Sequence, residues 1–271
     1  MTSPLPPVIS QINVYPVKSL GGAFLQTSPV EPRGLRHDRR WMVTDPDGRF
    51  LSQRTLPRMA LISARTDADA LRLQAPSLPP LRVPLLPPAS AFPVDVRVWD
   101  SACRAVAPSP DADCWLSDFL QTPCRLVFMP DDTRRLVPAE FQRGQGLVSF
   151  ADAFPLLLLS EASLHDLNQR LDVPVPMDRF RPSIVVSGTA SYAEDDWRTI
   201  TIGEMLFYVV KPCARCLLTT VDQQTGVIGG PEPRRTLAGY RRRAEKVVFG
   251  QYLIPAAPGT LSVGMDVRVR G

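Results

Sequence analysis

The stretch "RRWMVTDPDGRFLSQR", residues 39–54, places a turn between two short apolar segments. Its central residues, Asp-Pro-Asp-Gly at 45–48, combine the fixed φ of proline with the freedom of glycine to adopt a positive φ, which is typical of the tip of a β-hairpin. Apolar residues lie on both sides of this tip, at 41–43 and 50–51. We therefore predict a hairpin, and with it a fold built from short strands.

Similar patterns fill the rest of the first hundred residues. Short stretches of alternating or β-branched residues, separated by turn residues, occur at 9–20, 59–65, 70–76 and 94–100. Several strands at such regular spacing predict a barrel or a sandwich. The proline-rich segment 76–93 has leucines between its prolines, and we predict short edge strands there rather than a linker.

The second half of the chain adds a few helices to the strands. An Asp cap at Asp111 and a Ser cap at Ser160 predict two helices, and residues 236–244 predict a short basic one. Further strands are predicted at 181–188, 198–210, 216–222, 250–255 and 260–270. The predicted class is mainly β with a few helices (α+β), with an N-terminal β-barrel-like domain at residues 1–125 packed on a second β-barrel domain at residues 126–271.

The charge balance excludes some classes of partner. Thirty-one basic and 27 acidic residues give a net charge of +4, which is too even to indicate a nucleic-acid-binding protein. Between residues 31 and 58, however, seven arginines stand against four acidic residues. This local excess predicts either a site for an anionic ligand or solvated charge on hairpin edges.

The N-terminal residues lack the basic and apolar regions of a secretion signal, and no segment approaches the roughly 20 apolar residues of a membrane span. We expect a cytoplasmic protein without a membrane span. Its five cysteines are then reduced.

Two of these cysteines, Cys213 and Cys216, form a Cys-x-x-Cys pair. A zinc site is disfavoured because no second pair of ligands has matching spacing, and a thioredoxin-type pair because 216–222 is expected to be a strand rather than a helix. Packing of both thiols in the core remains open. Lys211 and Arg215, however, put positive charge beside the sulfurs, which favours a thiolate ligand for a metal carried by an organic, phosphate-bearing cofactor.

Five blocks of the sequence resemble the MOSC proteins that carry an N-terminal β-barrel domain. The blocks are 14–20 (VYPVKSL), 34–54, 180–188 (FRPSIVVSG), 211–226 (KPCARCLLTTVDQQTG) and 249–269. This family includes the mitochondrial amidoxime-reducing component, its bacterial relatives and the C-terminal part of molybdenum cofactor sulfurase. The resemblance covers nearly the whole chain in the same order, and it implies that the two domains are a MOSC N-terminal β-barrel domain and a MOSC domain.

The resemblance implies a molybdenum cofactor, Mo-molybdopterin, and a set of residues that hold it. Cys216 matches the cysteine that is the protein ligand of molybdenum, which makes it both the metal ligand and the catalytic residue. The residues that match cofactor-binding positions are Lys18, Ser19, Arg39, Asp152, Arg181 and Ser183, the last standing where relatives have asparagine. Cys213 has no implied role.

The activity that the resemblance implies is reduction of N-hydroxylated small molecules. Since the sequence has no cysteine cluster for an iron–sulfur centre, the electrons are expected from separate donor proteins, a ferredoxin or a cytochrome b5-like protein with a reductase. One alternative is a sulfur carrier that bears a persulfide on Cys216, stabilised by the nearby cations. Another is a pterin-binding module without turnover.

Overall fold

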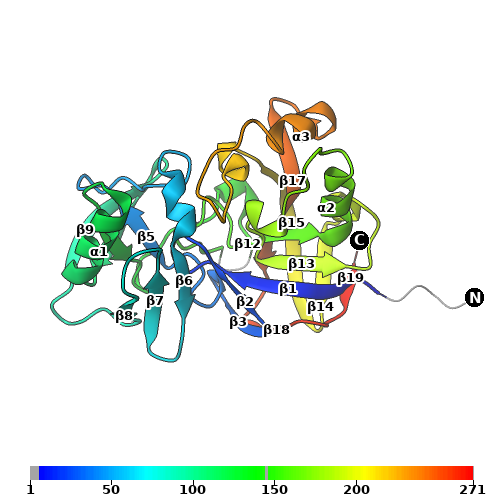
Figure 1. Ribbon diagram of the computed structural model, residues 1–271. Coiled ribbons are helices and arrows are strands. Elements are labelled where there is room, and N and C mark those ends of the chain that lie inside the picture. The colour runs from blue at the N-terminus through cyan, green and yellow to red at the C-terminus, as the bar shows by residue number, and fades with distance from the viewer. Residues whose placement is uncertain (1–5, 144–145, 271) are drawn as a thin grey trace, which may run out of the picture.

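The computed structural model describes residues 6–143 and 146–270, and it divides into two lobes (Figure 1). One lobe contains β5 to β9 and α1. The other contains the largest sheet, with α2 and α3 at its surface. Strands outnumber helices throughout, which confirms the prediction of a mainly β protein with a few helices.

The largest sheet has nine strands in the order β19-β14-β15-β17-β12-β13-β1-β2, with β16 paired to β17. Their bounds are β1 Val8–Val14, β2 Ala23–Leu25, β12 Leu156–Ser160, β13 Ile184–Ser187, β14 Thr199–Ile202, β15 Met205–Ala214, β16 Arg242–Arg243, β17 Lys246–Pro255 and β19 Val267–Val269. A bridge between Val8 and Asp266 connects β1 to the segment before β19, so the sheet curls toward a barrel although its ladder is open.

Apolar side chains on the inner face of this sheet form its core. Ile12, Leu158, Ile184, Phe207 and Leu253 are fully buried there. A small sheet of β18 (Gly259–Ser262), β3 (Thr27–Glu31) and β4 (Gly34–Leu35) packs its Val30, Leu35 and Leu261 into the same core. Two helices, α2 (Glu161–Asn168) and α3 (Arg234–Tyr240), cover a second cluster that includes Phe180 and Phe249.

The other lobe is built from two antiparallel sheets and one helix. The first sheet has the order β5 (Trp41–Thr44), β11 (Arg125–Phe128), β10 (Ser101–Ala107), β9 (Phe92–Val98), and the second has β6 (Ser63–Thr66), β7 (Ala70–Gln74), β8 (Leu81–Pro84). Since β8 is the edge strand of the second sheet, the prediction for the proline-rich segment is confirmed. Helix α1 (Pro110–Leu120) packs Trp115, Leu116 and Phe119 into the core of this lobe.

Local predictions in this lobe were partly wrong. The cap of α1 is Ser109 rather than Asp111, because the Ser109 hydroxyl accepts the Ala112 N–H at 3.2 Å. Residues 57–61 form a 3-10 helix, η1, which starts at Pro57, and the strand begins only at Ser63. The turn at 45–48 is present, but the hairpin that it closes is reduced to a single bridge between Thr44 and Phe50.

The strand predicted at 216–222 was also wrong. Residues Leu217–Thr220 form a 3-10 helix, η5. The two threonines stabilise it, because Thr219 Oγ1 donates to the carbonyl oxygen of Cys216 at 3.0 Å and Thr220 Oγ1 to that of Leu217 at 2.7 Å. Hydrogen bonds from a side-chain hydroxyl to the backbone offer the chain an alternative to pairing with a neighbouring strand. Here they outweigh the β propensity of threonine.

The chain crosses between the lobes more than once. Strands β1 to β4, at the N-terminal end, pair with β13 and β18 from the C-terminal half. Residues 36–128 then build the other lobe before the chain returns at β12. A division at residue 125 therefore stays a prediction about domains, and the first strands contribute to the sheet of the second half.

Candidate functional site

A pocket between the two lobes brings together the seven residues that the sequence predicted as metal-ligating or cofactor-binding. It encloses about 850 Å³, including its open mouth. Side chains from both lobes and from the loops around β12, β13, β15 and β17 line it. The predicted residues among them are Lys18, Ser19, Arg39, Asp152, Arg181, Ser183 and Cys216.

Three of these residues lie in turns with a left-handed backbone. Ser19, Arg39 and Arg181 have φ values of 67°, 50° and 54°. For residues other than glycine this conformation is uncommon and costs about 1–3 kcal/mol, so it persists only where the surrounding contacts fix it. The Arg39 N–H, for example, donates to the Tyr15 carbonyl oxygen at 2.8 Å. The turns aim polar side chains at the pocket from the ends of strands.

Lys18 and Asp152 form an ion pair at the pocket wall. Lys18 Nζ lies 2.5 Å from Asp152 Oδ1, and the Trp99 indole N–H donates to the same oxygen at 3.1 Å. Burial lowers the pKa of Lys18, although the Asp152 charge opposes that shift. Burial raises the pKa of Asp152, but the Lys18 charge and hydrogen bond outweigh this and hold it below its usual range. Asp152 is therefore ionised at neutral pH, and its charge favours the protonated form of Lys18.

Two arginines pack against one tyrosine ring beside the pocket. The guanidinium carbons of Arg39 and Arg181 lie 4.4 Å and 4.2 Å from the centroid of the Tyr15 ring. Asp38 balances one of them, since it accepts from Arg39 Nη1 at 2.5 Å and from the Tyr15 N–H at 2.8 Å. Burial and the nearby Arg39 charge lower the pKa of Arg181 to about 10. Arg181 forms no ion pair with a carboxylate of the described residues, so its positive charge is not balanced within this cluster.

Three arginines in the pocket lining keep N–H groups that find no acceptor within the described part of the chain. These are Nη2 of Arg181, Nη2 of Arg215 and Nε of Arg179, all shielded from solvent. Backbone oxygens fix the Arg215 side chain, because its Nε donates to the Phe249 carbonyl oxygen at 2.8 Å and its Nη1 to that of Phe180 at 3.0 Å. A buried guanidinium without its full set of acceptors is costly, so the pocket suits an anionic ligand.

Sequence reasoning missed part of this lining. Arg179 was not predicted, and Arg215 was considered only for its effect on the cysteines. No local signal marks Arg179, whose Nη2 is paired with Asp222 at 2.9 Å from a distant loop. Lys211, expected beside the sulfurs, is not among the pocket residues, and its Nζ lies 5.0 Å from the Phe141 ring centroid.

The arginine-rich segment 31–58 does not act as one cradle. Only Arg39 and Arg54 of its seven arginines line the pocket. Arg33 and Arg40 are buried and bond to backbone oxygens of residues 129–133 and 148. Their role is structural, because they satisfy carbonyl groups of two segments that lie outside the strands.

The cysteine pair is asymmetric. Cys213 is buried and Cys216 is exposed, and both border the pocket. Burial raises the pKa of the Cys213 thiol, against the opposing charge of Arg215. Cys213 therefore remains a thiol at neutral pH, as core packing predicts. The Cys216 sulfur is the accessible one.

Families of known proteins match both halves of the chain. Residues 7–123 match the MOSC N-terminal beta barrel domain, and residues 145–268 match the MOSC domain. Mitochondrial amidoxime-reducing component 1 of Mus musculus is 38% identical over 97% of this chain and 82% of its own length. The chain belongs to this MOSC family.

Other members give the same result. Mitochondrial amidoxime-reducing component 1 of Homo sapiens is 36% identical, and mitochondrial amidoxime reducing component 2 of Rattus norvegicus is 34% identical. The alignments cover 97% and 96% of this MOSC chain and 83% and 82% of the relatives. In the parts of the chain that the structure describes, no helix is long and apolar enough to cross a membrane. A cytoplasmic location stays a prediction, while these relatives are named as mitochondrial.

Proposed function

We propose that this MOSC protein is a molybdenum-dependent reductase of N-hydroxylated small molecules. The observation that carries the proposal is the exposed Cys216 thiol in a pocket whose arginines have unused, buried N–H groups. A thiolate is the ligand that a soft metal prefers, and cationic N–H groups are the partners that the phosphate of a pterin cofactor needs. The names of the relatives support the same reaction class.

Different residues of the pocket would hold different parts of the cofactor. Cys216 would be the protein ligand of the metal, and Arg181, Arg215 and Arg179 would hold its anionic groups. Lys18, Ser19 and Arg39 would bind the cofactor from the opposite wall of the pocket. Asp152 would keep Lys18 charged and in place, and Ser183, whose hydroxyl accepts the Leu157 N–H at 3.4 Å, would order the backbone at the pocket floor.

The cofactor supplies the two-electron chemistry that the side chains cannot. Overall, an amidoxime takes up two electrons and two protons, its N–O bond breaks, and the products are an amidine and water. The chain contributes a polar pocket, open at one side, that holds the substrate beside Cys216. The two electrons come from a separate donor.

Metal analysis and a turnover assay test the proposal together. Protein prepared in cells that make the cofactor should contain about one molybdenum per chain and reduce benzamidoxime with reduced methyl viologen. The Cys216→Ala variant should lose both the metal and the activity. A wild-type protein that holds molybdenum and reduces no N-hydroxylated compound would instead be a binding module.

A sulfur carrier is the second candidate, and the exposure of Cys216 favours it equally. Intact-mass measurement separates the two. A carrier should show the mass of one added sulfur on Cys216, removed by a thiol reductant, and it needs no stoichiometric metal.

A further inference from the structure

An exposed apolar patch lies along the segment 217–228, which starts next to Cys216 and leads toward α3. Leu217, Val227 and Ile228 are 56%, 57% and 44% exposed. Leu217 directly follows Cys216, and the loop that carries the other two is held by a bridge between Val221 and Ile228. Three large apolar side chains exposed on one short segment are typical of an interaction site.

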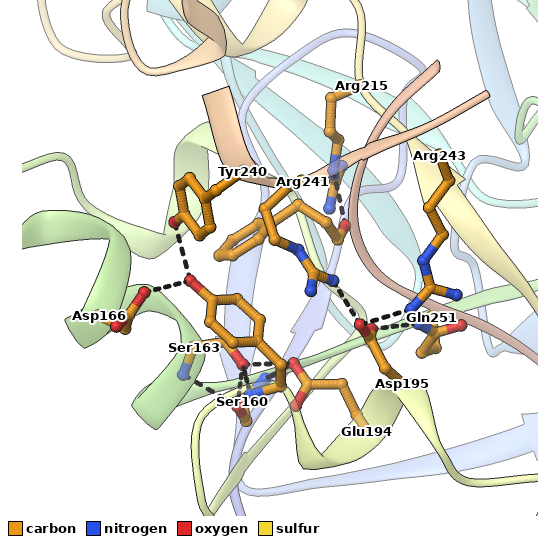
Figure 2. Close-up of polar contacts among 12 residues, drawn as sticks. Ser160, Ser163, Asp166, Glu194, Asp195, Arg215, Tyr240, Arg241, Arg243 and Gln251 are labelled. Atoms are coloured by element: carbon orange, nitrogen blue, oxygen red, sulfur yellow. Dashed lines mark hydrogen bonds and ion pairs between the residues drawn. The ribbon is translucent and has the colours of Figure 1, made fainter. Parts of the chain in front are cut away.

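Positive charge follows this patch along the chain. Residues 232–246 contain six basic and two acidic residues. Asp195 pairs with Arg241 at 2.6 Å and Arg243 at 2.9 Å (Figure 2), and Glu232 pairs with Arg235 at 2.6 Å. Those pairs leave three exposed cations that have no carboxylate partner among residues 6–143 and 146–270, namely Arg234, Arg242 and Lys246.

This surface is connected to the pocket wall. Helix α3 packs on both η5 and β16. Beneath α3, the ring of Tyr240 lies 6.1 Å from that of Tyr192, which lies 6.3 Å from Phe249, and Phe249 lies 4.6 Å from Phe180. Phe180 lines the pocket. Since Cys216 caps η5 and α3 contacts η5, a partner on α3 would contact the element next to Cys216.

We propose that the η5–α3 surface, formed by Leu217, Val227, Ile228, Arg234 and Arg242, binds an acidic one-electron carrier protein. The proposal rests on the proposed function, in which two carriers each give one electron, both are oxidised, and the N–O bond takes up the pair with two protons. The carrier's acidic side chains meet the unpaired arginines, and its apolar residues cover the patch.

The character of the surface fits a redox encounter. Such complexes are small and transient, and they bury less than about 1,200 Å² in total. Opposite charges mainly accelerate association, and the effect is screened by salt. Apolar and cationic side chains on a surface next to the metal ligand would let a carrier bind close to the metal and dissociate quickly.

Charge reversal tests the surface. The variants Arg234→Glu and Arg242→Glu, alone and together, are compared with wild type using two probes, a plant-type ferredoxin and a soluble cytochrome b5 domain, each kept reduced by its own reductase. The double variant should lower kcat/KM for the carrier by about tenfold or more, and raising the salt from 50 to 300 mM should lower the wild-type value by roughly severalfold. Leu217→Ser should weaken the carrier's apparent affinity without changing the salt dependence.

Two controls keep the outcome clear. Arg97→Glu, on β9 in the other lobe (Figure 1), makes the same charge change at an exposed arginine and should leave carrier kinetics unaltered. Methyl-viologen-driven benzamidoxime reduction should be equal in all variants, and its absence in wild type would overturn the proposed function rather than the surface.

Two outcomes of the carrier assays would overturn the surface. One is carrier kinetics that do not change in the Arg234→Glu/Arg242→Glu variant, and the other is failure of both carriers to supply electrons to the wild-type protein. Binding to phosphatidylglycerol vesicles that these variants abolish while carrier kinetics stay unchanged would also overturn it.

Discussion

Arg39 donates a hydrogen bond from Nη2 to the backbone carbonyl oxygen of Arg181, 3.2 Å away, although 142 residues separate them in the chain. Both residues have positive φ angles, and both guanidinium groups pack on Tyr15. The contact joins the turn before β5 to the turn before β13. The Arg39 side chain thereby helps to hold the strained backbone of Arg181, and the pocket gains two cations from distant parts of the sequence.

Replacing Arg181 by methionine should affect the two forms of the protein in opposite ways. Without cofactor, a buried charge beside Arg39 is lost, so the melting temperature should stay equal to that of wild type or rise. With cofactor, the variant should retain at least tenfold less molybdenum, because charge-assisted hydrogen bonds to the anion are lost. Calorimetry and metal analysis of both forms check this. A lower melting temperature of the cofactor-free variant would contradict this prediction, because it would show that neighbouring groups stabilise the Arg181 charge in the folded protein.

The same cluster predicts a pH dependence at high pH. The pKa of Arg181 in the folded protein, about 10, is lower than its value in the unfolded chain, so the unfolded chain binds more protons between the two values. The destabilising contribution of the charged form is present below pH 10 and is relieved as the pH rises above it. Between pH 9 and pH 11, the difference in unfolding free energy between wild type and Arg181→Met should therefore narrow.

Asp152→Asn should destabilise the protein at neutral pH, because it leaves the buried Lys18 without its anion. Asp152 is 53% exposed on its side chain, so we expect a modest loss of about 1 kcal/mol after solvent screening. The pKa of Asp152 is depressed on folding, so its contribution is present above about pH 4 and is lost as the pH falls below that. Urea unfolding checks this. The difference in unfolding free energy between wild type and Asp152→Asn should be smaller at pH 3 than at pH 7.

Asp131→Asn is the matched control for that variant. Asp131 pairs with another buried cation, Arg40, at 2.7 Å, but its side chain is 92% exposed and Arg40 also bonds to the Met129 carbonyl oxygen. We expect a change within about 0.5 kcal/mol at either pH. Equal losses in the two variants would contradict a special role of the Lys18–Asp152 pair.

Cys216→Ala and Cys213→Ala should separate the two thiols. Both variants should fold, and only the first should lose molybdenum. Cys213 is buried, so its replacement should cost about 1 kcal/mol in unfolding free energy while metal content stays near that of wild type. Loss of metal from both variants would make Cys213 part of the metal site.

Gly250→Ala should disturb Arg215 without touching the pocket directly. Gly250 has a φ of 79°, and a Cβ there would lie 2.7 Å from the Leu158 carbonyl oxygen and 3.5 Å from Arg215 Nη2. We expect a loss of about 2 kcal/mol or more, together with weaker cofactor retention. Gly229→Ala is the control, because no atom lies within 4 Å of its added Cβ, and its stability in denaturant titrations should match wild type within about 0.5 kcal/mol.

Local patterns were sufficient for much of the fold. Alternating strands, the Asp-Pro-Asp-Gly turn and the Ser160 cap depend on neighbouring residues, and the structure has them where the sequence predicts. The wrong predictions fell where two local preferences compete. At residues 217–220, threonine favours a strand by its branching and a 3-10 turn by its hydroxyl, and the contacts of η5 with α3 and with η3 (Met177–Arg179) add to the second preference.

By itself, the sequence determined the mainly β class, the family and seven of the residues that line the pocket, because these depend on residue identities in order along the chain. Tertiary structure decided the rest. It buried Cys213 and exposed Cys216, used Arg33 and Arg40 to support a loop, and brought Arg179 and Arg215 to the ligand side. The physical reason is that burial and unsatisfied hydrogen-bond donors are properties of segments that meet in space, and no local pattern records which segments meet.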